Sequence, residues 1–212
     1  DASNPVLSFT HDAVGKTPAV AVYEGLTGYD GPSGRQLSDV LTRHDLKYRY
    51  YDGSTWSGEK TLTPADGLYD SQASVAFNGQ GRGVAAWVHN TSASAFAADG
   101  SYARNAQDVQ AAVWNPASHT WSAPLTISGA GDGVADIKPA TVVDASGTAI
   151  VTWIRGDAAS NTLFYSRYDG KAWSAPTQVA VDGIAPGSYG EVALGVDDQG
   201  MANLLFSHRV KN

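Results

Sequence analysis

The stretch YDGKAWSAP, residues 168–176, decides the fold, because a near copy, YDGSTWSGE, stands at residues 51–59. An Asp-Gly pair between apolar residues favours a tight hairpin turn, since Gly accepts the positive φ that such turns need and Asp caps the backbone after it. Two copies with the tryptophan in register indicate a repeated hairpin. A third copy, AAVWNPASHTWSAPLTI at residues 111–127, has a longer turn.

A second repeated hairpin alternates with the first. In it, Asp or Asn is followed three positions later by Gly, and an aromatic residue comes six positions after this Gly. We call this hairpin inner and the Trp-Ser hairpin outer. The inner copies run from Asn78 to Trp87, from Asp144 to Trp153, from Asp197 to Phe206 and, with a turn two residues longer, from Asp12 to Tyr23.

The spacing of the outer hairpins indicates how the strands assemble. Trp56, Trp121 and Trp173 recur after 65 and then 52 residues, close to the length of a four-stranded propeller blade. Runs such as TAIVTW, residues 148–153, are nearly all apolar or small, which is typical of strands buried on both faces. We therefore expect the tryptophans to be structural and to pack between adjacent sheets; the alternative is an exposed tryptophan that stacks on a sugar.

The sequence predicts an all-β fold, a β-propeller of four-stranded antiparallel blades. Four inner and three outer hairpins make about 3.5 blades, whereas closed propellers have about four to eight, so the chain is expected to be a partial propeller or a fragment of a larger ring. The remaining blades would come from a longer chain or a second polypeptide. We expect one propeller segment, residues 1–212, with blade units at 4–64, 71–128 and 137–181 and a half blade at 190–209.

Composition excludes several function classes. The 212 residues carry 14 Lys and Arg against 21 Asp and Glu, a net charge of -7, whereas nucleic-acid binding needs a basic footprint. The absence of cysteine excludes disulfides and Cys-ligated zinc. No stretch reaches the roughly 18 to 20 apolar residues that cross a bilayer, so we expect no membrane insertion. The first residues, DASNPV, lack the layout of a signal peptide, so an exported protein would already have lost its signal.

The turn pattern Asp-Gly-x-x-Trp resembles bacterial propellers with sialidase-type (BNR or Asp-box-like) repeats, and the similarity covers nearly the whole chain. That family's Asp box reads Ser-x-Asp-x-Gly-x-x-Trp, whereas Asp52-Gly53 and Asp169-Gly170 are adjacent here, as in fucose-binding and related lectin-like propellers. The resemblance implies the fold more strongly than a function, because propellers host unrelated activities. The sequence shows no recognisable arginine triad or Arg-Ile-Pro signature of sialidases, so sialidase activity is not implied.

Candidate site residues gather where the inner hairpins lead into the long connections 25–46 and 90–108. His89, Arg155 and His208 each stand two residues after the repeated aromatic, so we expect them to converge around the central axis of the propeller. Long loops in compact folds are often functional, although solvated strand ends explain polar residues there equally well. The expected ligand-binding residues are Tyr23, Glu24, His44, His89, Asn90, Arg155, Asp157, His208 and Arg209, with Tyr29, Tyr102 and Arg104 added from the long loops.

These residue types suit a carbohydrate. Arg can hold a carboxylate through two hydrogen bonds, and aromatic rings stack on sugar faces. We therefore expect a carbohydrate-binding, lectin-like propeller segment of a secreted or cell-surface bacterial protein, with a glycan or polysaccharide as its ligand. The alternative is a polysaccharide lyase, or a glycoside hydrolase, that uses His89, His208, Arg155 and Tyr102 as catalytic residues. A second alternative is a structural propeller that binds another protein.

No cofactor is expected. The histidines lack a zinc-binding spacing such as His-x-x-x-His. Ca²⁺ is conceivable on the repeated Asp-x-x-Gly turns because they offer oxygen ligands, yet capping of the turn backbone explains these aspartates more simply.

Overall fold

The computed structural model describes residues 2–9, 18–26, 43–92, 106–156, 161–182 and 187–210. These residues form fifteen β-strands and no α-helix, in four antiparallel sheets whose strands pair with their neighbours in the chain, except that β9 pairs with β7. The predicted all-β fold of four-stranded antiparallel sheets is confirmed. In the described part of the chain, no helix is long and apolar enough to span a membrane.

The strand bounds follow the repeated hairpins. The first sheet contains β1 (Ala2–Phe9), β2 (Ala19–Leu26), β3 (His44–Tyr51) and β4 (Lys60–Thr61). The second contains β5 (Asp70–Phe77), β6 (Gly83–Asn90), β7 (Gln107–Asn115), β8 (Thr120–Trp121) and β9 (Leu125–Thr126), and both β8 and β9 pair with β7. The third contains β10 (Asp136–Val143), β11 (Ala149–Gly156), β12 (Asn161–Tyr168) and β13 (Thr177–Gln178). The fourth contains β14 (Gly187–Val196) and β15 (Ala202–Val210).

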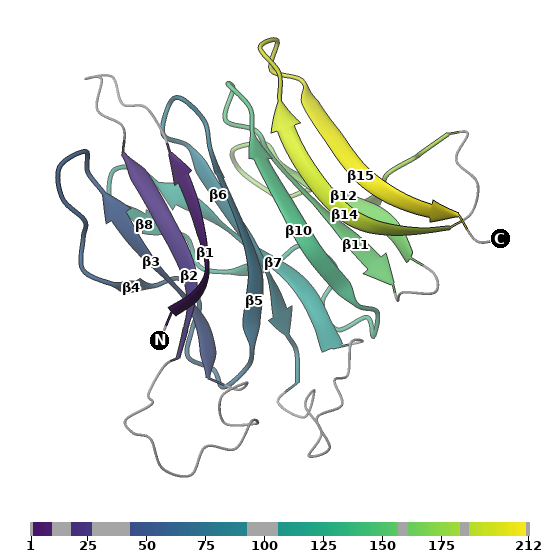
Figure 1. Ribbon diagram of the computed structural model, residues 1–212, viewed down its shortest axis with the longest axis horizontal. Coiled ribbons are helices and arrows are strands. Elements are labelled where there is room, and N and C mark those ends of the chain that lie inside the picture. Colours follow the sequence, from purple (N-terminus) through teal and green to yellow (C-terminus); the bar gives the residue numbers. More distant parts are fainter. Residues whose placement is uncertain are drawn as a thin grey trace.

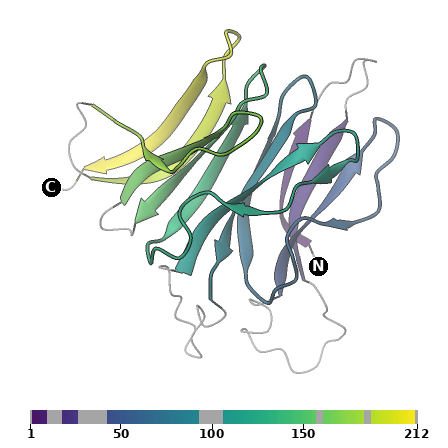
Figure 2. The same cartoon turned by 180° about the vertical axis from the view of Figure 1, so that it is seen from behind.

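The four sheets stand side by side like segments of a ring. The first strands form a row, in which β5 contacts β1 on one side and β10 on the other, and β10 also contacts β14. The later strands of each sheet extend away from this row. Figures 1 and 2 show the sheets as successive wedges, from the first in purple to the fourth in yellow. The fourth sheet has two described strands, so the structure has the predicted three and a half blades.

Two apolar clusters fill the spaces between the first three sheets. Trp87 of β6 belongs to the cluster between the first and second sheets, and Trp153 of β11 belongs to the cluster between the second and third; neither side chain reaches solvent. All eight residues of β6 are buried, as the apolar runs predict for a strand with a sheet on each side. Residues at the inner faces of the sheets therefore have fixed neighbours, and this rigid core positions the strand ends.

The tryptophans of the outer hairpins differ in their surroundings. Trp121 packs against the first apolar cluster and Trp173 against the second, as predicted. Trp56 is 46% exposed, which corrects the expectation that it packs between two sheets. The reason is its position in the first sheet: Trp121 and Trp173 pack toward the preceding sheet, and no described sheet precedes the first one.

The turns form as their sequence predicts. Asp52 Oδ1 accepts hydrogen bonds from the backbone N–H groups of Ser54 and Thr55, and Asp169 Oδ1 accepts them from Lys171 and Ala172. Gly53 and Gly170 have φ of 92° and 95°, a region that other residues rarely adopt. These backbone hydrogen bonds lower the pKa of Asp169, which shows that the charged form caps the turn.

Candidate functional site

Acidic and basic side chains meet at the end of the molecule where the second strand of each sheet leads into the third. β5 and β6 pair in a register that sets Asp70 opposite His89, and β10 and β11 set Asp136 opposite Arg155. Both pairs lie the same number of residues from their hairpin turn, so they are equivalent positions of successive sheets. The fold thus places a carboxylate on the first strand beside a cationic side chain on the second.

The Asp70–His89 pair is buried. His89 Nδ1 lies 2.8 Å from Asp70 Oδ1, and Asp70 has no exposed surface. Burial alone would lower the pKa of His89, but the hydrogen bond to Asp70 and the charge of this carboxylate outweigh burial and raise it. With Nδ1–H donating to Asp70, Nε2 is the nitrogen left to meet a ligand or a proton, which is the arrangement of a histidine held in one tautomer.

The Asp136–Arg155 pair is held by more contacts. Arg155 Nε donates to Asp136 Oδ1 and Nη2 donates to Asp136 Oδ2, both at 2.8 Å, and Nη2 also donates to the backbone carbonyl of Ser128. The guanidinium lies over the ring of Phe164, 4.6 Å from its centroid. The hydrogen bonds and charge of Asp136 raise the pKa of Arg155. The structure therefore fixes this guanidinium in place rather than leaving it to swing toward a ligand.

Two more aspartates join the pairs into one group. Asp108 of β7 stands opposite His89 in register, and its Oδ2 accepts a hydrogen bond from Gly131 N at 3.0 Å. The charges of His89 and Arg155 both act on Asp108, and Asp132 Oδ2 lies 3.2 Å from Arg155 Nη2. Burial raises the pKa of Asp108 despite these cations. We call the group the loop-face cluster; it consists of Asp70, His89, Asp108, Asp132, Asp136 and Arg155.

The loop-face cluster has the oxygen atoms of a cation site but already contains a cation. Carboxylate oxygens of Asp108, Asp132 and Asp136 lie within 4.8 Å of one another. Hard cations such as Ca²⁺ take six to eight oxygen ligands. Here the guanidinium of Arg155 contacts two of the three carboxylates, so it supplies the positive charge that a metal ion would otherwise bring. The arrangement thus fits a polar site that already holds a cationic side chain better than it fits a metal site.

A second polar group lies between the first and second sheets. Glu24 Oε2 accepts a hydrogen bond from Asn4 Nδ2 at 2.9 Å, and Glu24 Oε1 accepts one from Gln72 N at 3.2 Å. His44 Nδ1 is 3.8 Å from Glu24 Oε2, and the rings of His44 and Tyr69 are 5.2 Å apart. Burial alone would raise the pKa of Glu24, but the nearby His44 imidazole and the hydrogen bonds from Asn4 and Gln72 outweigh burial and lower the pKa. Glu24 is therefore a charged, structurally fixed carboxylate.

A line of strained residues crosses the innermost strands. Asn4, Gln72 and Lys138 occupy the same bulge in β1, β5 and β10, with φ of 48°, 53° and 54°. The backbone N–H of Lys138 donates to Gln72 Oε1 at 2.9 Å, and Lys138 Nζ donates to the carboxylate of Glu191 in β14. Such backbone conformations cost on the order of 1–3 kcal/mol each and persist where contacts from neighbouring elements hold them. Together with the hydrogen bond from Gln72 N to Glu24, these contacts link all four sheets near the loop-face cluster.

The residues expected from the sequence fall into separate places. His89 and Arg155 lie in the loop-face cluster, and Asn90 is buried next to His89. Tyr23 lies on the face of the first sheet opposite Glu24, where its hydroxyl donates to Glu59 Oε2 at 2.8 Å. His208 lies in the fourth sheet with its ring 5.0 Å from that of Tyr189, and Arg209 next to it is exposed. Tyr29, Tyr102, Arg104 and Asp157 lie outside the described residues.

Sequence reasoning missed the acidic half of the site. Asp70, Asp108, Asp132 and Asp136 were not expected, because they come from strand starts and links that lie far along the chain from His89 or Arg155. One signal was available: Asp70 and Asp136 both stand seven residues before the end of their strand, Phe77 and Val143. This matched spacing predicts that the two aspartates are equivalent, although it does not predict their partners.

Comparison with solved structures identifies the fold. A Hadza microbial sialidase aligns with a TM-score of 0.53 at 14% identity, over 89% of this chain and 39% of that one. An ulvan lyase aligns with a TM-score of 0.50 at 13% identity, over 90% and 49%. An α-L-arabinanase of Penicillium chrysogenum aligns with a TM-score of 0.53 at 12% identity, over 95% and 58%. The fold is a partial β-propeller.

The predicted propeller with sialidase-like relatives is thereby confirmed. The chain spans 39% of the sialidase, 49% of the ulvan lyase and 58% of the arabinanase. No protein-family model and no curated protein matches the sequence. Because identities of 9–14% show the fold alone, the function has to be argued from the site.

Proposed function

We propose that this chain is a carbohydrate-binding segment of a β-propeller, with the glycan at the loop-face cluster. The observation that carries the proposal is that His89, Asp132 and Arg155 lie in one partly exposed group, at the end of the molecule where β6 ends and β7 begins. The solved propellers named above as a sialidase, an ulvan lyase and an arabinanase lend support by analogy.

The charge of the loop-face cluster favours a neutral, hydroxyl-rich sugar. Four carboxylates face one guanidinium and one imidazole, so the group carries more acid than base. A second negative charge on the ligand would meet net repulsion there, whereas sugar hydroxyls can donate to carboxylates and accept from His89. Asp132, with a side chain 32% exposed, is the carboxylate most open to such a ligand.

Binding is favoured over cleavage because Arg155 is engaged by other protein groups. A lyase needs a cation to neutralise the uronate carboxylate while a base removes the neighbouring proton. Nε and Nη2 of Arg155 already donate hydrogen bonds to Asp136 and to the Ser128 carbonyl, so these two groups are not free to bind a uronate carboxylate. The observation in favour of a lyase is the Asp70–His89 hydrogen bond, which would orient His89 as a base. Catalysis is therefore the second candidate function.

The test is a glycan array with the full-length protein and two matched variants. Asp132→Asn keeps the shape of the side chain but removes its charge and weakens its hydrogen bonds, so we expect binding to a neutral glycan to fall about tenfold. Asp198→Asn changes an exposed aspartate of the fourth sheet's hairpin turn, at the other end of the strands, and should bind like the wild type. An ultraviolet assay for unsaturated sugar product on uronate polymers reports lyase activity.

The outcomes separate the candidates. Glycan binding that Asp132→Asn weakens and Asp198→Asn leaves intact supports the proposal. Release of unsaturated product that His89→Gln abolishes would replace binding with lyase activity. Absence of both binding and product release would refute a carbohydrate function and favour a structural, protein-binding propeller.

We propose further blades at both ends of the partial ring, from a longer chain or a second polypeptide. Leu7 and Phe9 of β1 are 50% and 57% exposed, and Leu205 of β15 is 74% exposed. The second strands β2, β6 and β11 each pair on both sides, whereas β15 has a partner on one side in the described part of the chain. Exposed apolar residues and a free strand edge are features that a neighbouring blade would cover.

A secreted or cell-surface location in a bacterium fits the proposed glycan ligand and is part of this proposal.

A further inference from the structure

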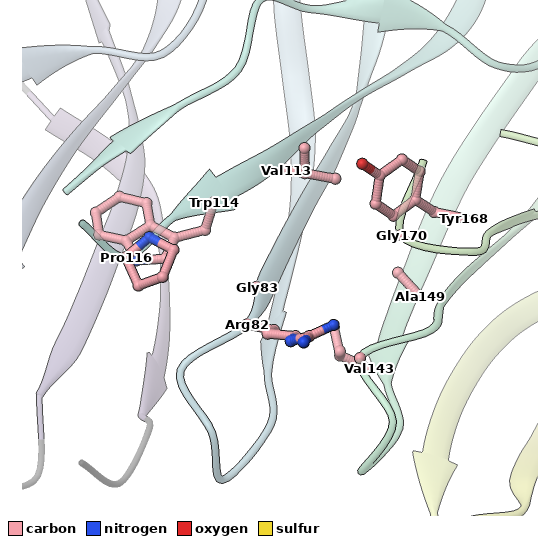
Figure 3. A pocket seen from close by; sticks show the side chains of 10 residues that line it. Arg82, Gly83, Val113, Trp114, Pro116, Val143, Ala149, Tyr168 and Gly170 are labelled. Carbon is pink, nitrogen blue, oxygen red and sulfur yellow. The ribbon is translucent and has the colours of Figure 1, made fainter. Parts of the chain in front are cut away.

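A pocket of about 220 Å³ opens between the second and third sheets, at the end that carries the hairpin turns. It lies at the opposite end of the strands from the loop-face cluster, since Val143 ends β10 and Asp136 begins it. Figure 3 shows its side chains converging from both sheets. We call it the turn-face pocket; it is lined by Arg82, Gly83, Val113, Trp114, Pro116, Val143, Gly147, Ala149, Tyr168 and Gly170.

The turn-face pocket exists because three repeat positions carry smaller residues at this interface than at the preceding one. Phe77 and Val143 are equivalent: each ends the first strand of its sheet and pairs with the first residue of the next strand. Between the first and second sheets, the Phe77 ring packs against Trp114, with ring centroids 5.7 Å apart, and Tyr50 packs against the same indole at 5.7 Å.

Between the second and third sheets, smaller residues stand at these three positions. Val143 replaces Phe77, Val113 replaces Tyr50, and Tyr168 replaces Trp114. Protein interiors are close-packed, and voids larger than a water molecule are few. Aromatic rings fill the interface between the first and second sheets. The equivalent space between the second and third sheets is left open and has room for one ring-sized ligand.

The chemistry of the lining defines that ligand. Val113, Val143 and Ala149 form apolar walls, and Figure 3 shows the Tyr168 hydroxyl directed across the pocket toward Val113. Arg82 lies at the rim, exposed, and its Nη1 donates to the Ser146 carbonyl at 3.3 Å. In the described part of the chain, no carboxylate forms an ion pair with Arg82. A guanidinium without an acidic partner beside apolar walls favours a carboxylate on an apolar-faced ring.

The position of the Arg82 side chain requires a glycine at residue 147. Gly147 has φ of +87°, and a Cβ built there would lie 2.3 Å from Arg82 Cδ and 2.5 Å from Arg82 Nη1. The arginine side chain therefore lies directly over the glycine backbone in a space that any other residue would take. Gly147, in the turn between β10 and β11, thus leaves room for the Arg82 side chain, which comes from the turn between β5 and β6.

We propose that the turn-face pocket binds a six-membered ring carrying a carboxylate, with the ring between Val113 and Val143 and the carboxylate on Arg82. An aromatic acid and a uronic acid share this chemistry, because a pyranose also has apolar faces. The pocket volume admits one ring with its substituents. This site is separate from the loop-face cluster and does not depend on the function proposed there.

The experiment is a calorimetric titration of the full-length protein with benzoate and with glucuronate. A near-millimolar dissociation constant is expected for at least one of them, since a single ring offers few contacts. Binding of benzoate alone identifies aromatic acids as the ligand class, and binding of glucuronate alone identifies uronic acids. Binding of both supports the shared chemistry. Binding of neither overturns the proposal.

Two variants locate the binding. Val143→Phe with Ala149→Gly transplants the pair Phe77 and Gly83, in which the missing Cβ of Gly83 would lie 2.4 Å from the Phe77 ring. This double variant should fill the pocket and reduce affinity at least tenfold. Circular dichroism checks its fold. Unchanged affinity in a folded double variant would contradict the proposal.

Arg82→Gln provides a test that does not alter the core. Affinity for the carboxylate should fall about tenfold, the lower range for a charge-assisted hydrogen bond at an exposed arginine. Affinity for the neutral analogue of the acid that binds, benzamide or glucuronamide, should stay as in the wild type. Arg43→Gln, an exposed arginine next to β3, is the matched control and should leave both unchanged. Equal losses in Arg82→Gln and Arg43→Gln would overturn the assignment of Arg82.

Discussion

Removal of the Arg155 guanidinium should destabilise the protein more than removal of any exposed charge. Asp136 has no exposed surface, and Arg155 gives it two hydrogen bonds of 2.8 Å. In Arg155→Met this carboxylate stays buried without its cation, and breaking such a pair costs about 3–5 kcal/mol. The lost contact with Phe164 and the Ser128 carbonyl acts in the same direction.

The assay is urea unfolding followed by tryptophan fluorescence, together with thermal unfolding. At about 2–4 °C per kcal/mol for a chain of this length, the thermal midpoint should fall by about 6–20 °C. Asp136→Leu combined with Arg155→Met should recover most of the loss, because apolar residues can replace a buried ion pair at little cost. Arg209→Met, at an exposed site, is the control. A loss below about 1 kcal/mol in Arg155→Met would refute the view that the pair is a buried, structurally required unit.

Three further predictions concern other parts of the structure. The pKa of His89 is raised above the ordinary 6.5, so the folded state binds this proton more tightly than the unfolded state does. The contribution of this proton to the free energy of unfolding should be complete below about pH 6.5 and should be lost as the pH rises through the raised pKa. His89→Gln should lack this pH dependence in urea unfolding at several pH values, and an unchanged dependence would contradict the assignment. Lys138 has φ of 54°, so Lys138→Gly should unfold about 1 kcal/mol less readily than Lys138→Ala, and equal midpoints would contradict backbone strain. Gly170 has φ of +95° and open space around its Cβ direction, so Gly170→Ala should cost about 1–2 kcal/mol from conformation alone, as measured by chemical unfolding; an unchanged midpoint would count against that turn geometry.

The fold could be predicted because its signals are local. Asp-Gly turns fix hairpins, and the repeated register of Trp121 and Trp173 shows that the hairpins recur as equal units. The exposure of Trp56 could not be read from the repeat, because it depends on whether another sheet precedes the first one. Repeats predict how neighbouring sheets of a ring pack together, whereas the exposure of residues in the end sheets depends on whether another sheet covers them.

The candidate site was predicted in part. Counting from the repeated aromatic residue gave the equivalence of His89 and Arg155, which the strand register supports. Tyr23 and Glu24 were expected together, yet neighbouring residues of a strand point to opposite faces, and they lie apart. The bulges at Gln72 and Lys138 left no sequence signal, because a bulge is a matter of strand pairing and these residues are not glycines.

A crystal structure of the full-length protein with the best-binding array glycan tests most directly whether a glycan binds at the loop-face cluster. We predict sugar density within hydrogen-bond distance of Asp132 and His89, between the second and third sheets. Sugar density elsewhere on the molecule, with Asp132 and His89 still contacting solvent or protein alone, would contradict the account.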